Sequence, residues 1–279
     1  MKNSKTLFIA DLDGTLLGNG AELSEYSKAS LNEMIGQGLY ISAATARTYA
    51  TAAKIVSEVN WNVPLALFNG ALIYDMGRSQ SALIHEINEI AIKAVLKVLK
   101  KHSASGILYK FENNAQISYY ETLGSSAVRQ FIAYRNARYN KEFIKANSFQ
   151  AIVPKCIACF AVLGQYDEIV AVQSDLLSVA DISAIAYKER YIESVWCLEI
   201  YSEQSSKQNA INWLREQYGF GCVVGFGDSA NDLPMLKACD VRVAVGNADP
   251  ELKRAAHYIC ETNERDGVVR WISSYTKNI

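Results

Sequence analysis

The amino-acid sequence predicts an α/β protein with a Rossmann-like parallel-sheet core and an inserted α+β domain. Short apolar segments alternate with helical patterns at the start of the chain, and the same alternation returns near its end. Strands separated by helices of this length are typical of βαβ units, which form parallel sheets. Between about residues 78 and 195 fewer strands end in glycine and tyrosines are more frequent. The middle of the chain is therefore predicted to fold differently from both ends.

The N-terminal part is predicted to contain three strands with helices between them. Its apolar runs give strands at 5–10, 39–44 and 63–68, and its helical patterns lie at 23–38 and 47–60. Ser24 suits the N-cap of the first helix, because its hydroxyl can accept a hydrogen bond from a free N–H of the first turn. The third strand ends at Asn69-Gly70.

The other elements follow from the same patterns. The middle is predicted to have helices at 88–102 and 166–179 and strands at 115–121 and 151–163, and a strand at 196–201 lies near the return to the first pattern. The C-terminal part is predicted to have strands at 221–226, 241–245 and 257–260 and helices at 206–219, 229–239 and 266–276. These patterns divide the chain into a core of residues 1–77 and 196–279 and an inserted α+β domain of residues 78–195.

The charge balance argues against large polyanionic partners. The chain has 28 basic and 29 acidic residues, a net charge of −1, and no long run of one sign. Nucleic-acid-binding and membrane-surface proteins usually carry a basic excess. The apolar run near the N-terminus stops at Asp11, too early for a secretory signal or a membrane span. We therefore expect a cytoplasmic protein that acts on small molecules; its oligomeric state is not predicted.

Residues 7–17, LFIADLDGTLL, place two carboxylates directly after a buried strand. Two anions so close together repel each other, and burying even one is costly unless it is paired or bound to a cation. A cation is therefore expected near Asp11 and Asp13.

Other polar residues are expected at the same edge of the sheet, because ligand sites of open α/β sheets lie outside the carboxyl ends of the strands. The residues that follow or precede predicted strands in this way are Asp11, Asp13, Thr45, Arg47, Asn69, Lys207, Asp228, Asn231 and Asp232. Four carboxylates form a hard, oxygen-rich set that suits Mg²⁺. Lys207 and Thr45 suit a phosphoryl group instead, and a carboxylate can serve as a nucleophile.

These motifs resemble those of a known superfamily. DLDGT at 11–15 resembles the first motif of the haloacid dehalogenase superfamily, and FGDSANDLPML at 226–236 is similar to its fourth motif in the Cof-type phosphatases. Thr45 resembles the second motif and Lys207 the third. An insertion after the third strand resembles the subgroup with a class IIB cap, in which AVGNA (244–248) and DGV (266–268) also recur. The resemblance covers residues 1–75 and 196–279 well, and the cap only by position and size.

The resemblance implies a Mg²⁺-dependent phosphatase that hydrolyses a small phosphorylated metabolite, such as a sugar phosphate, through an aspartyl-phosphate. Asp11 would be the nucleophile and Asp13 the general acid and base, and the implied catalytic set is completed by Thr45 and Lys207. The implied phosphate- or substrate-binding residues are Leu12, Gly14, Thr45, Ala46, Arg47, Asn69, Lys207 and Asn231. The implied metal ligands are Asp11, Asp13 (through its backbone carbonyl) and Asp228, while Asp232 would be a further ligand or would orient Lys207.

Several alternatives remain open. Many relatives have Thr-Gly-Arg where this chain has Thr45-Ala46-Arg47, and the alanine methyl is harmless only if its φ is negative. Arg47 could contact a substrate anion or face solvent, and Asn69-Gly70 could be a plain turn. The same chemistry would suit a phosphotransferase or mutase that passes the phosphoryl group to another acceptor. A sensor that binds a phosphorylated metabolite without turnover is the alternative outside the enzymes.

Overall fold

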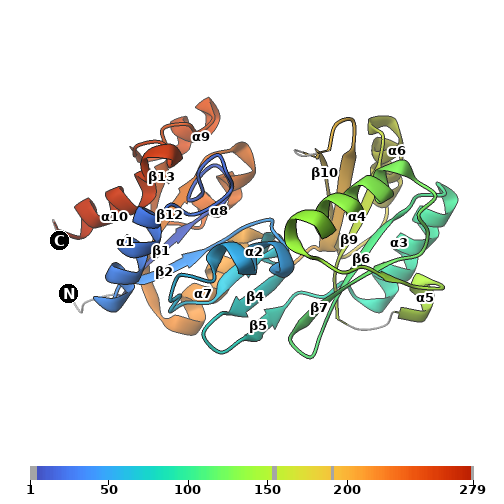
Figure 1. The fold of residues 1–279 in the computed structure, drawn as a ribbon, viewed down its shortest axis with the longest axis horizontal. Helices are drawn as coiled ribbons and strands as arrows, with labels where there is room; N and C mark the ends of the chain where they lie inside the picture. Colours follow the sequence, from blue (N-terminus) through green and yellow to red (C-terminus); the bar gives the residue numbers. More distant parts are fainter. Residues whose placement is uncertain (1–4, 153–155, 190–191, 278–279) are drawn as a thin grey trace. The chain divides into compact units, whose positions relative to one another are not determined.

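The structure is a computed structural model that describes residues 5–152, 156–189 and 192–277 (Figure 1). The chain forms two compact units. The first contains the residues up to Leu83 together with those from Ser206 onward, and the second is Ile84–Ser205. Within the described ranges, every helix is too short or too polar to cross a lipid bilayer.

A five-stranded parallel sheet forms the centre of the first unit, with the strand order β14-β13-β12-β1-β2. Its strands are β1 (Lys5–Ala10), β2 (Tyr40–Ala43), β12 (Phe220–Gly227), β13 (Val241–Ala244) and β14 (Tyr258–Ile259). The central strands β1 and β12 are buried from Leu7 and Val223 onward, as expected for a parallel sheet covered on both faces. The predicted α/β core is confirmed.

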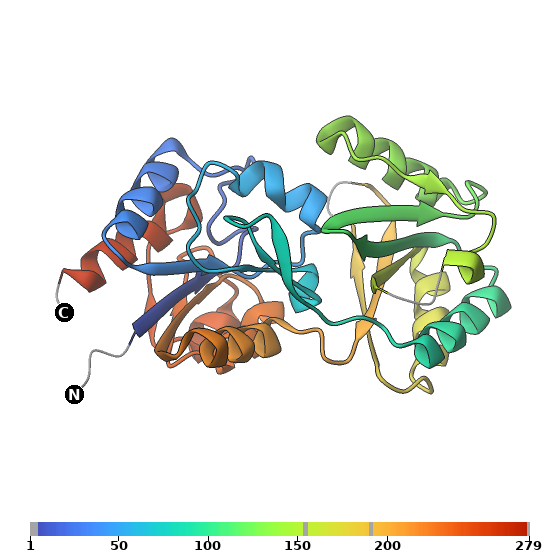
Figure 2. The same cartoon turned by 90° about the horizontal axis from the view of Figure 1, so that it is seen from below.

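Helices cover both faces of this sheet (Figure 2). One face carries α1 (Glu25–Gly36) and α10 (Gly267–Thr276), and the other carries α7 (Lys207–Tyr218) and α8 (Leu233–Lys237). Alternation along β12 explains this arrangement: the Phe226 ring packs at 5.4 Å from Trp271 of α10, whereas Gly225 leaves room for Leu236 of α8. The remaining helices of the unit are α2 (Tyr49–Val56) and α9 (Pro250–Ala255).

The third predicted strand, β3 (Leu65–Leu67), belongs to a small second sheet with the order β3-β4-β5. The strands β4 (Leu72–Asp75) and β5 (Gln80–Ile84) were not predicted. A bridge between Ala44 and Ala66 and a hydrogen bond from Thr45 N to Ala66 O, 2.8 Å, connect β3 to the end of β2, and Ser42 Oγ of β2 donates to Pro64 O at 2.7 Å. The expected third strand is therefore present, but it does not extend the five-stranded sheet.

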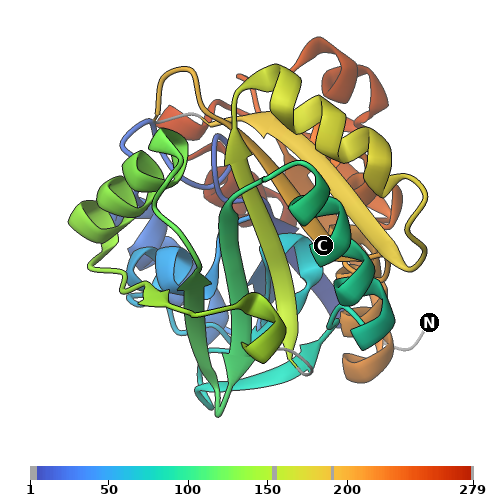
Figure 3. The same ribbon diagram turned by 90° about the vertical axis from the view of Figure 1, so that its right-hand side faces the viewer.

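The second unit contains a six-stranded sheet in the order β10-β11-β9-β6-β7-β8, antiparallel except between β7 and β8. Its strands are β6 (Gly106–Glu112), β7 (Ala115–Tyr120), β8 (Ile144–Lys145), β9 (Ile157–Gly164), β10 (Ile182–Lys188) and β11 (Trp196–Ser202). Figure 3 shows α3 (Glu89–Lys101) and α6 (Tyr166–Leu176) on one face and α4 (Ser126–Tyr139) on the other. This architecture confirms the predicted α+β insertion.

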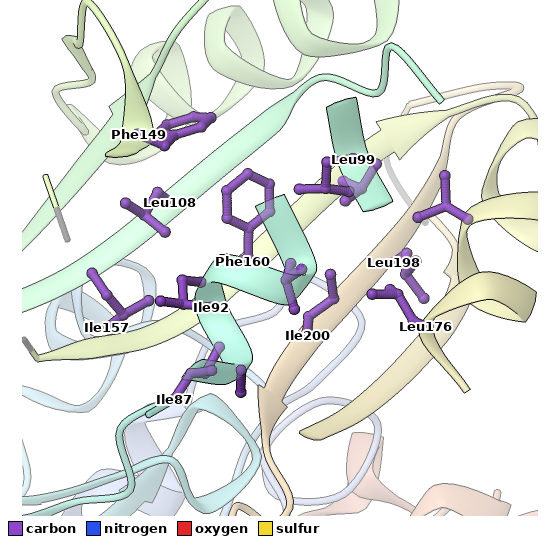
Figure 4. Close-up of a cluster of buried hydrophobic side chains, with 14 of the residues drawn as sticks. Ile87, Ile92, Leu99, Leu108, Phe149, Ile157, Phe160, Leu176, Leu198 and Ile200 are labelled. Atoms are coloured by element: carbon purple, nitrogen blue, oxygen red, sulfur yellow. The ribbon is translucent and has the colours of Figure 1, made fainter. Parts of the chain in front are cut away.

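The apolar core of this unit lies between α3, α6 and the sheet (Figure 4). Ile92 and Leu99 of α3 and Leu176 of α6 face Phe160 of β9 and Leu198 of β11. Each of these side chains is at least 95% removed from solvent, and burial of such a side chain contributes about 1.5–3 kcal/mol. The helix predicted at 88–102 is therefore present as α3, and its apolar face is buried in this core.

Two predicted elements differ in the structure. The strand expected at 151–163 is a short helix, α5 (Phe149–Ile152), followed by β9, and residues 153–155 lie outside the described residues. The strand at 196–201 was assigned to the core, but β11 pairs with β9 and β10 of the second sheet. The compact units consequently divide at 83/84 and 205/206 instead of 77/78 and 195/196.

Candidate active site

The parallel register of the sheet brings the predicted site residues to one edge. Ala10, the last residue of β1, pairs with Phe226 of β12 and with Ala43 of β2, so the three strands end at the same level. Asp11 continues the ladder by donating its backbone N–H to Phe226 O at 3.0 Å. The segments that follow these strands therefore meet although they are some 200 positions apart in the sequence.

Three carboxylates and one ammonium group form the centre of the site. Oxygens of Asp11, Asp228 and Asp232 all lie within 4.8 Å of one another. The Lys207 Nζ, at the first turn of α7, lies 2.5 Å from Asp11 Oδ1 and 2.7 Å from Asp232 Oδ1. Ser206 caps this helix by accepting a hydrogen bond from Asn209 N, which fixes the point where Lys207 enters the site.

Asp232 is held by hydrogen bonds on both of its carboxylate oxygens. Besides the Lys207 ammonium on Oδ1, the backbone N–H groups of Asp228 and Ser229 donate to Oδ2 at 3.1 and 3.4 Å. Its side chain is completely buried. These contacts favour the role of orienting Lys207 over that of a metal ligand.

Burial dominates the electrostatics of this cluster. Burial raises the pKa of Asp11 well above its ordinary value; Lys207 opposes the rise and Asp232 adds to it. Burial, with the nearby Asp232, also raises the pKa of Asp228 to about 6. For Lys207 burial disfavours the charged form, but Asp11 and Asp232 outweigh it and raise its pKa. The carboxyls of Asp11 and Asp228 therefore resist ionisation, because one protonated lysine cannot neutralise three carboxylates.

The Asp13 carboxylate is not a member of this cluster and is bound by Arg47. The guanidinium donates twice, from Nε to Oδ2 and from Nη2 to Oδ1, both at 2.6 Å. Such a bidentate salt bridge fixes the orientation of the carboxylate relative to the guanidinium plane. Arg47 therefore does not simply face solvent: its side chain is only 9% exposed and fixes Asp13.

The turn after Asp11 depends on glycine. Gly14 has a φ of +79°, and a Cβ atom there would lie 2.3 Å from Asp228 Oδ2. Only glycine permits both the left-handed backbone and the close approach of the two acidic segments. The carbonyl of the buried Leu12 accepts the N–H groups of Leu16 and Leu17, which closes the turn.

The segment of the second motif is joined to the end of β3. Thr45 is buried, and its Oγ1 accepts the backbone N–H of Arg47 at 3.1 Å. Ala46 is not among the described residues with positive φ, so its methyl group causes no backbone strain. Asn69 adopts the left-handed conformation and donates its backbone N–H to Thr45 O at 3.0 Å. The backbone of Asn69 therefore helps to fix the position of Thr45.

Asn231 lies apart from the buried cluster. Its side chain is exposed, and its Oδ1 accepts a hydrogen bond from Ser229 Oγ at 2.5 Å. It lies in the same segment as Asp228 and Asp232, and this hydrogen bond is to Ser229 rather than to either carboxylate.

Thr15 and Asn247 contact the acidic segments through their side chains; both lie in the DLDGT and AVGNA motifs, but neither was predicted as a site residue. Thr15 donates its hydroxyl to Asp228 Oδ1 at 3.3 Å, and Asn247 donates its side-chain amide to Gly14 O at 2.7 Å. Asn247 follows β13 at the same sheet edge, so the rule that located the other site residues would have identified it too.

Comparison with known proteins agrees with this geometry. Residues 8–272 match the haloacid dehalogenase-like hydrolases. The chain is 22% identical to the 5-amino-6-(5-phospho-D-ribitylamino)uracil phosphatase YitU of Bacillus subtilis over 283 residues, which covers 99% of each chain.

Solved structures give the same result for the fold. A haloacid dehalogenase-like hydrolase from Bacteroides thetaiotaomicron superposes with a TM-score of 0.82 at 23% identity, covering 97% of this chain and 99% of that one. The subclass IIB sugar phosphatase BT4131 superposes with a TM-score of 0.71 at 20% identity, covering 98% and 99%. Since the family match spans almost the whole sequence, the chain is an enzyme of the haloacid dehalogenase-like hydrolase family.

Proposed function

We propose that the protein is a Mg²⁺-dependent phosphomonoester hydrolase that works through an aspartyl-phosphate at Asp11. The observation that supports this most directly is the convergence of Asp11, Asp228 and Asp232 within 4.8 Å around one ammonium group, that of Lys207. The three carboxylates carry more negative charge than one lysine supplies, so the site suits a hard divalent cation.

The donor set fits Mg²⁺ through two carboxylates and one carbonyl. Asp11 and Asp228 would bind it with side-chain oxygens and Asp13 with its backbone carbonyl. Asp232 would instead hold Lys207, because its two oxygens already accept hydrogen bonds. When bound, Mg²⁺ would neutralise charge on the phosphoryl group and on Asp11.

The proposed reaction has two steps at one phosphorus atom. Asp11 attacks phosphorus, the bond to the ester oxygen breaks, and Asp13 gives that oxygen a proton. Asp13 then takes a proton from water, which attacks phosphorus and releases phosphate and free Asp11. In the structure Arg47 holds the Asp13 carboxylate through both of its oxygens, so one of these hydrogen bonds opens when Asp13 carries the proton.

Other residues would stabilise the phosphoryl oxygens. The Thr45 hydroxyl accepts from Arg47 N, so its hydrogen remains able to donate to a phosphate oxygen. Lys207 supplies a buried positive charge next to the nucleophile. We assign Asn231 and the backbone amides of the Leu12–Gly14 turn to the same task, which is to stabilise charge in the transition state.

For the substrate we propose a small phosphate ester of a polyhydroxylated carbon chain. The Bacillus relative is named for a phosphoribityl compound, and the structural neighbour BT4131 is described as a sugar phosphatase. We assign selection of the leaving group to the second unit, Ile84–Ser205, as the cap of this enzyme.

The test is phosphate release from a panel of sugar, polyol and nucleoside monophosphates, with Mg²⁺ and with EDTA. We expect release with Mg²⁺ and none with EDTA. Asp11→Asn should lower release roughly 10³-fold or more, because an amide is a poor nucleophile. Glu216→Gln, an exposed change on α7, is the matched control and should retain wild-type activity.

Two outcomes would contradict the proposal. Release that persists in EDTA, or in Asp11→Asn, would remove the metal or the nucleophile from the mechanism. Mg²⁺ binding without release from any ester would favour transfer to another acceptor, or a metabolite sensor. Analysis of ³²P-labelled products with candidate acceptors would separate those two.

A further inference from the structure

A short segment after β13 binds two acidic loops of the site at once. Asn247 Nδ2 donates to Gly14 O at 2.7 Å, and the backbone N–H of Asp249, two residues later, donates to Asp228 O at 2.7 Å. The first bond reaches the loop that carries Asp11, and the second reaches the loop that carries Asp228. Residues 247–249 therefore connect two loops that are more than 200 positions apart in the sequence.

The segment is itself held from both sides. Asn247 Oδ1 accepts the backbone N–H of Asn263 at 3.0 Å, so its side-chain amide is fixed at both ends. Asn263 Nδ2 in turn donates to Leu17 O at 2.8 Å, a buried hydrogen bond to the far end of the Asp11 loop. Lys253 Nζ donates to Gly246 O at 2.6 Å. The link is thus part of a connected network.

The separation of the two acidic loops leaves little freedom. Gly14 and Asp228 are so close that one added carbon on Gly14 would overlap the Asp228 carboxylate. A cation shared by Asp11 and Asp228 needs a defined distance between them, and Mg²⁺ tolerates little departure from octahedral geometry. Groups that hold metal ligands in place commonly change metal affinity by 10- to 100-fold when removed.

We propose that Asn247 is a positioning residue that sets the distance between the Asp11 loop and the Asp228 loop for the divalent cation. The proposal rests on the proposed function, because it assumes that the cation binds there. Asn247 is exposed, and in this role it acts through Gly14 without contacting the substrate. Its removal should therefore affect metal binding far more than folding.

The test is Mg²⁺ binding to purified protein by isothermal titration calorimetry, alongside the dependence of phosphate release on Mg²⁺ concentration. We expect Asn247→Ala to weaken Mg²⁺ binding about 10-fold. The Mg²⁺ concentration for half-maximal activity should rise by the same factor, while kcat at saturating Mg²⁺ stays near the wild-type value. The urea midpoint should stay close to that of the wild type.

Asn32→Ala is the matched control. Asn32 also joins two segments of the first unit through its side-chain amide, donating to Glu58 O at 2.8 Å and accepting from Asn60 N at 2.7 Å. It contacts none of the site residues and should leave Mg²⁺ binding unchanged. An unchanged Mg²⁺ affinity in Asn247→Ala, or an equal loss in Asn32→Ala, would overturn the positioning role. If the wild type binds no Mg²⁺, the proposed function itself fails.

Discussion

Both units contain a cluster of buried charged side chains. The two clusters differ in how far the carboxylate charge is compensated by other groups of the protein. In the first unit Asp11, Asp228 and Asp232 crowd around a single ammonium group, that of Lys207. In the second unit each buried acid has partners of its own. The first cluster has surplus negative charge, whereas the second is neutralised within the protein.

The acids of the second unit are satisfied by neighbouring elements. Glu189 pairs with Arg135 of α4, Oε1 to Nη2, at 2.7 Å. Glu199 of β11 accepts hydrogen bonds from the hydroxyls of Tyr187 at 3.0 Å and Tyr201 at 2.6 Å. Burial raises the pKa of Glu199, and these two hydroxyls oppose that rise.

The difference separates a ligand site from a structural cluster. Burying a charge is costly, and the cost is offset by hydrogen bonds and opposite charges in the protein or by a bound ion. In the second unit hydrogen bonds and opposite charges within the protein offset this cost, so its cluster supports the fold without a ligand. The first unit leaves part of the cost uncompensated, which is the arrangement expected where a cation and a phosphoryl group bind.

Replacement of Lys207 should give the largest effect. In Lys207→Met the buried Asp11 and Asp232 lose their ammonium partner, so we expect the free energy of unfolding in EDTA to fall by about 3–5 kcal/mol. Added Mg²⁺ should restore part of that loss, because a ligand of the native state stabilises it. Urea unfolding in EDTA and in Mg²⁺ measures both quantities, and phosphate release should be abolished.

Lys28→Met provides the contrast for this prediction. Lys28 also bridges two carboxylates, those of Glu25 at 2.9 Å and Glu58 at 2.6 Å, but both acids are exposed. Surface pairs of this kind contribute about 0–1 kcal/mol. A loss as large in Lys28→Met as in Lys207→Met, or no recovery of Lys207→Met with Mg²⁺, would show that the first cluster needs no cation.

Disruption of the second cluster should lower stability without any link to metal. Arg135→Met leaves the buried Glu189 without its guanidinium, so we expect a loss of about 3 kcal/mol that is the same in EDTA and in Mg²⁺. Urea unfolding is again the measurement. The double variant Arg135→Met/Glu189→Gln should recover much of the loss, because no charge is then left unpaired.

The matched control is Arg129→Met on the same helix, since Arg129 is exposed and donates only to backbone carbonyls. Arg129→Met should lower the free energy of unfolding by much less than Arg135→Met. A dependence of the Arg135→Met loss on Mg²⁺ would contradict the division between the two clusters.

Much of the site could be predicted because it is tied to strand ends. Asp11, Thr45 and Asp228 follow parallel strands that end at one level, so the strand pattern alone was sufficient to group them. The pair between Arg47 and Asp13 could not be predicted, since it depends on how two loops fold toward each other. Asn247 obeys the strand-end rule and lies in the AVGNA segment, but an uncharged amide in that segment does not by itself indicate which groups it contacts.

The second unit was less predictable for a related reason. The strand 196–201 has the apolar composition of a core strand, and only its pairing with β9 and β10 shows that it belongs to the insertion. Helix α4, which contributes Arg135, was not predicted because its polar and apolar residues show no clear helical periodicity. β11 pairs with two preceding strands of the insertion, and the apolar pattern of a single strand does not identify its partners.

Lys141 is the one exception to the self-neutralised character of the second cluster among the described residues of that unit. It is 5% exposed, and its Nζ lies 4.4 Å from the ring centroid of Tyr109 and 5.2 Å from that of Phe143, with no carboxylate in ion-pair distance among the described residues. Burial and the charge of Arg135 lower the pKa of Lys141 to about 7, while Cys159 and Glu199 oppose the shift.

Lys141→Met should therefore have a smaller, pH-dependent effect. Between the native pKa of about 7 and the ordinary value of 10.5 the unfolded chain binds a proton that the native state does not, so the wild-type free energy of unfolding rises with pH. Lys141→Met lacks this rise, so its free energy of unfolding should exceed that of the wild type by the largest amount at or below pH 7. This difference should shrink toward pH 10 by at most about 1.4 kcal/mol per pH unit. Urea unfolding of both proteins across that range measures the difference. Lys145→Met, at an exposed lysine of β8, should show no such trend; an equal trend there, or none in Lys141→Met, would mean that Lys141 stays charged in the folded protein.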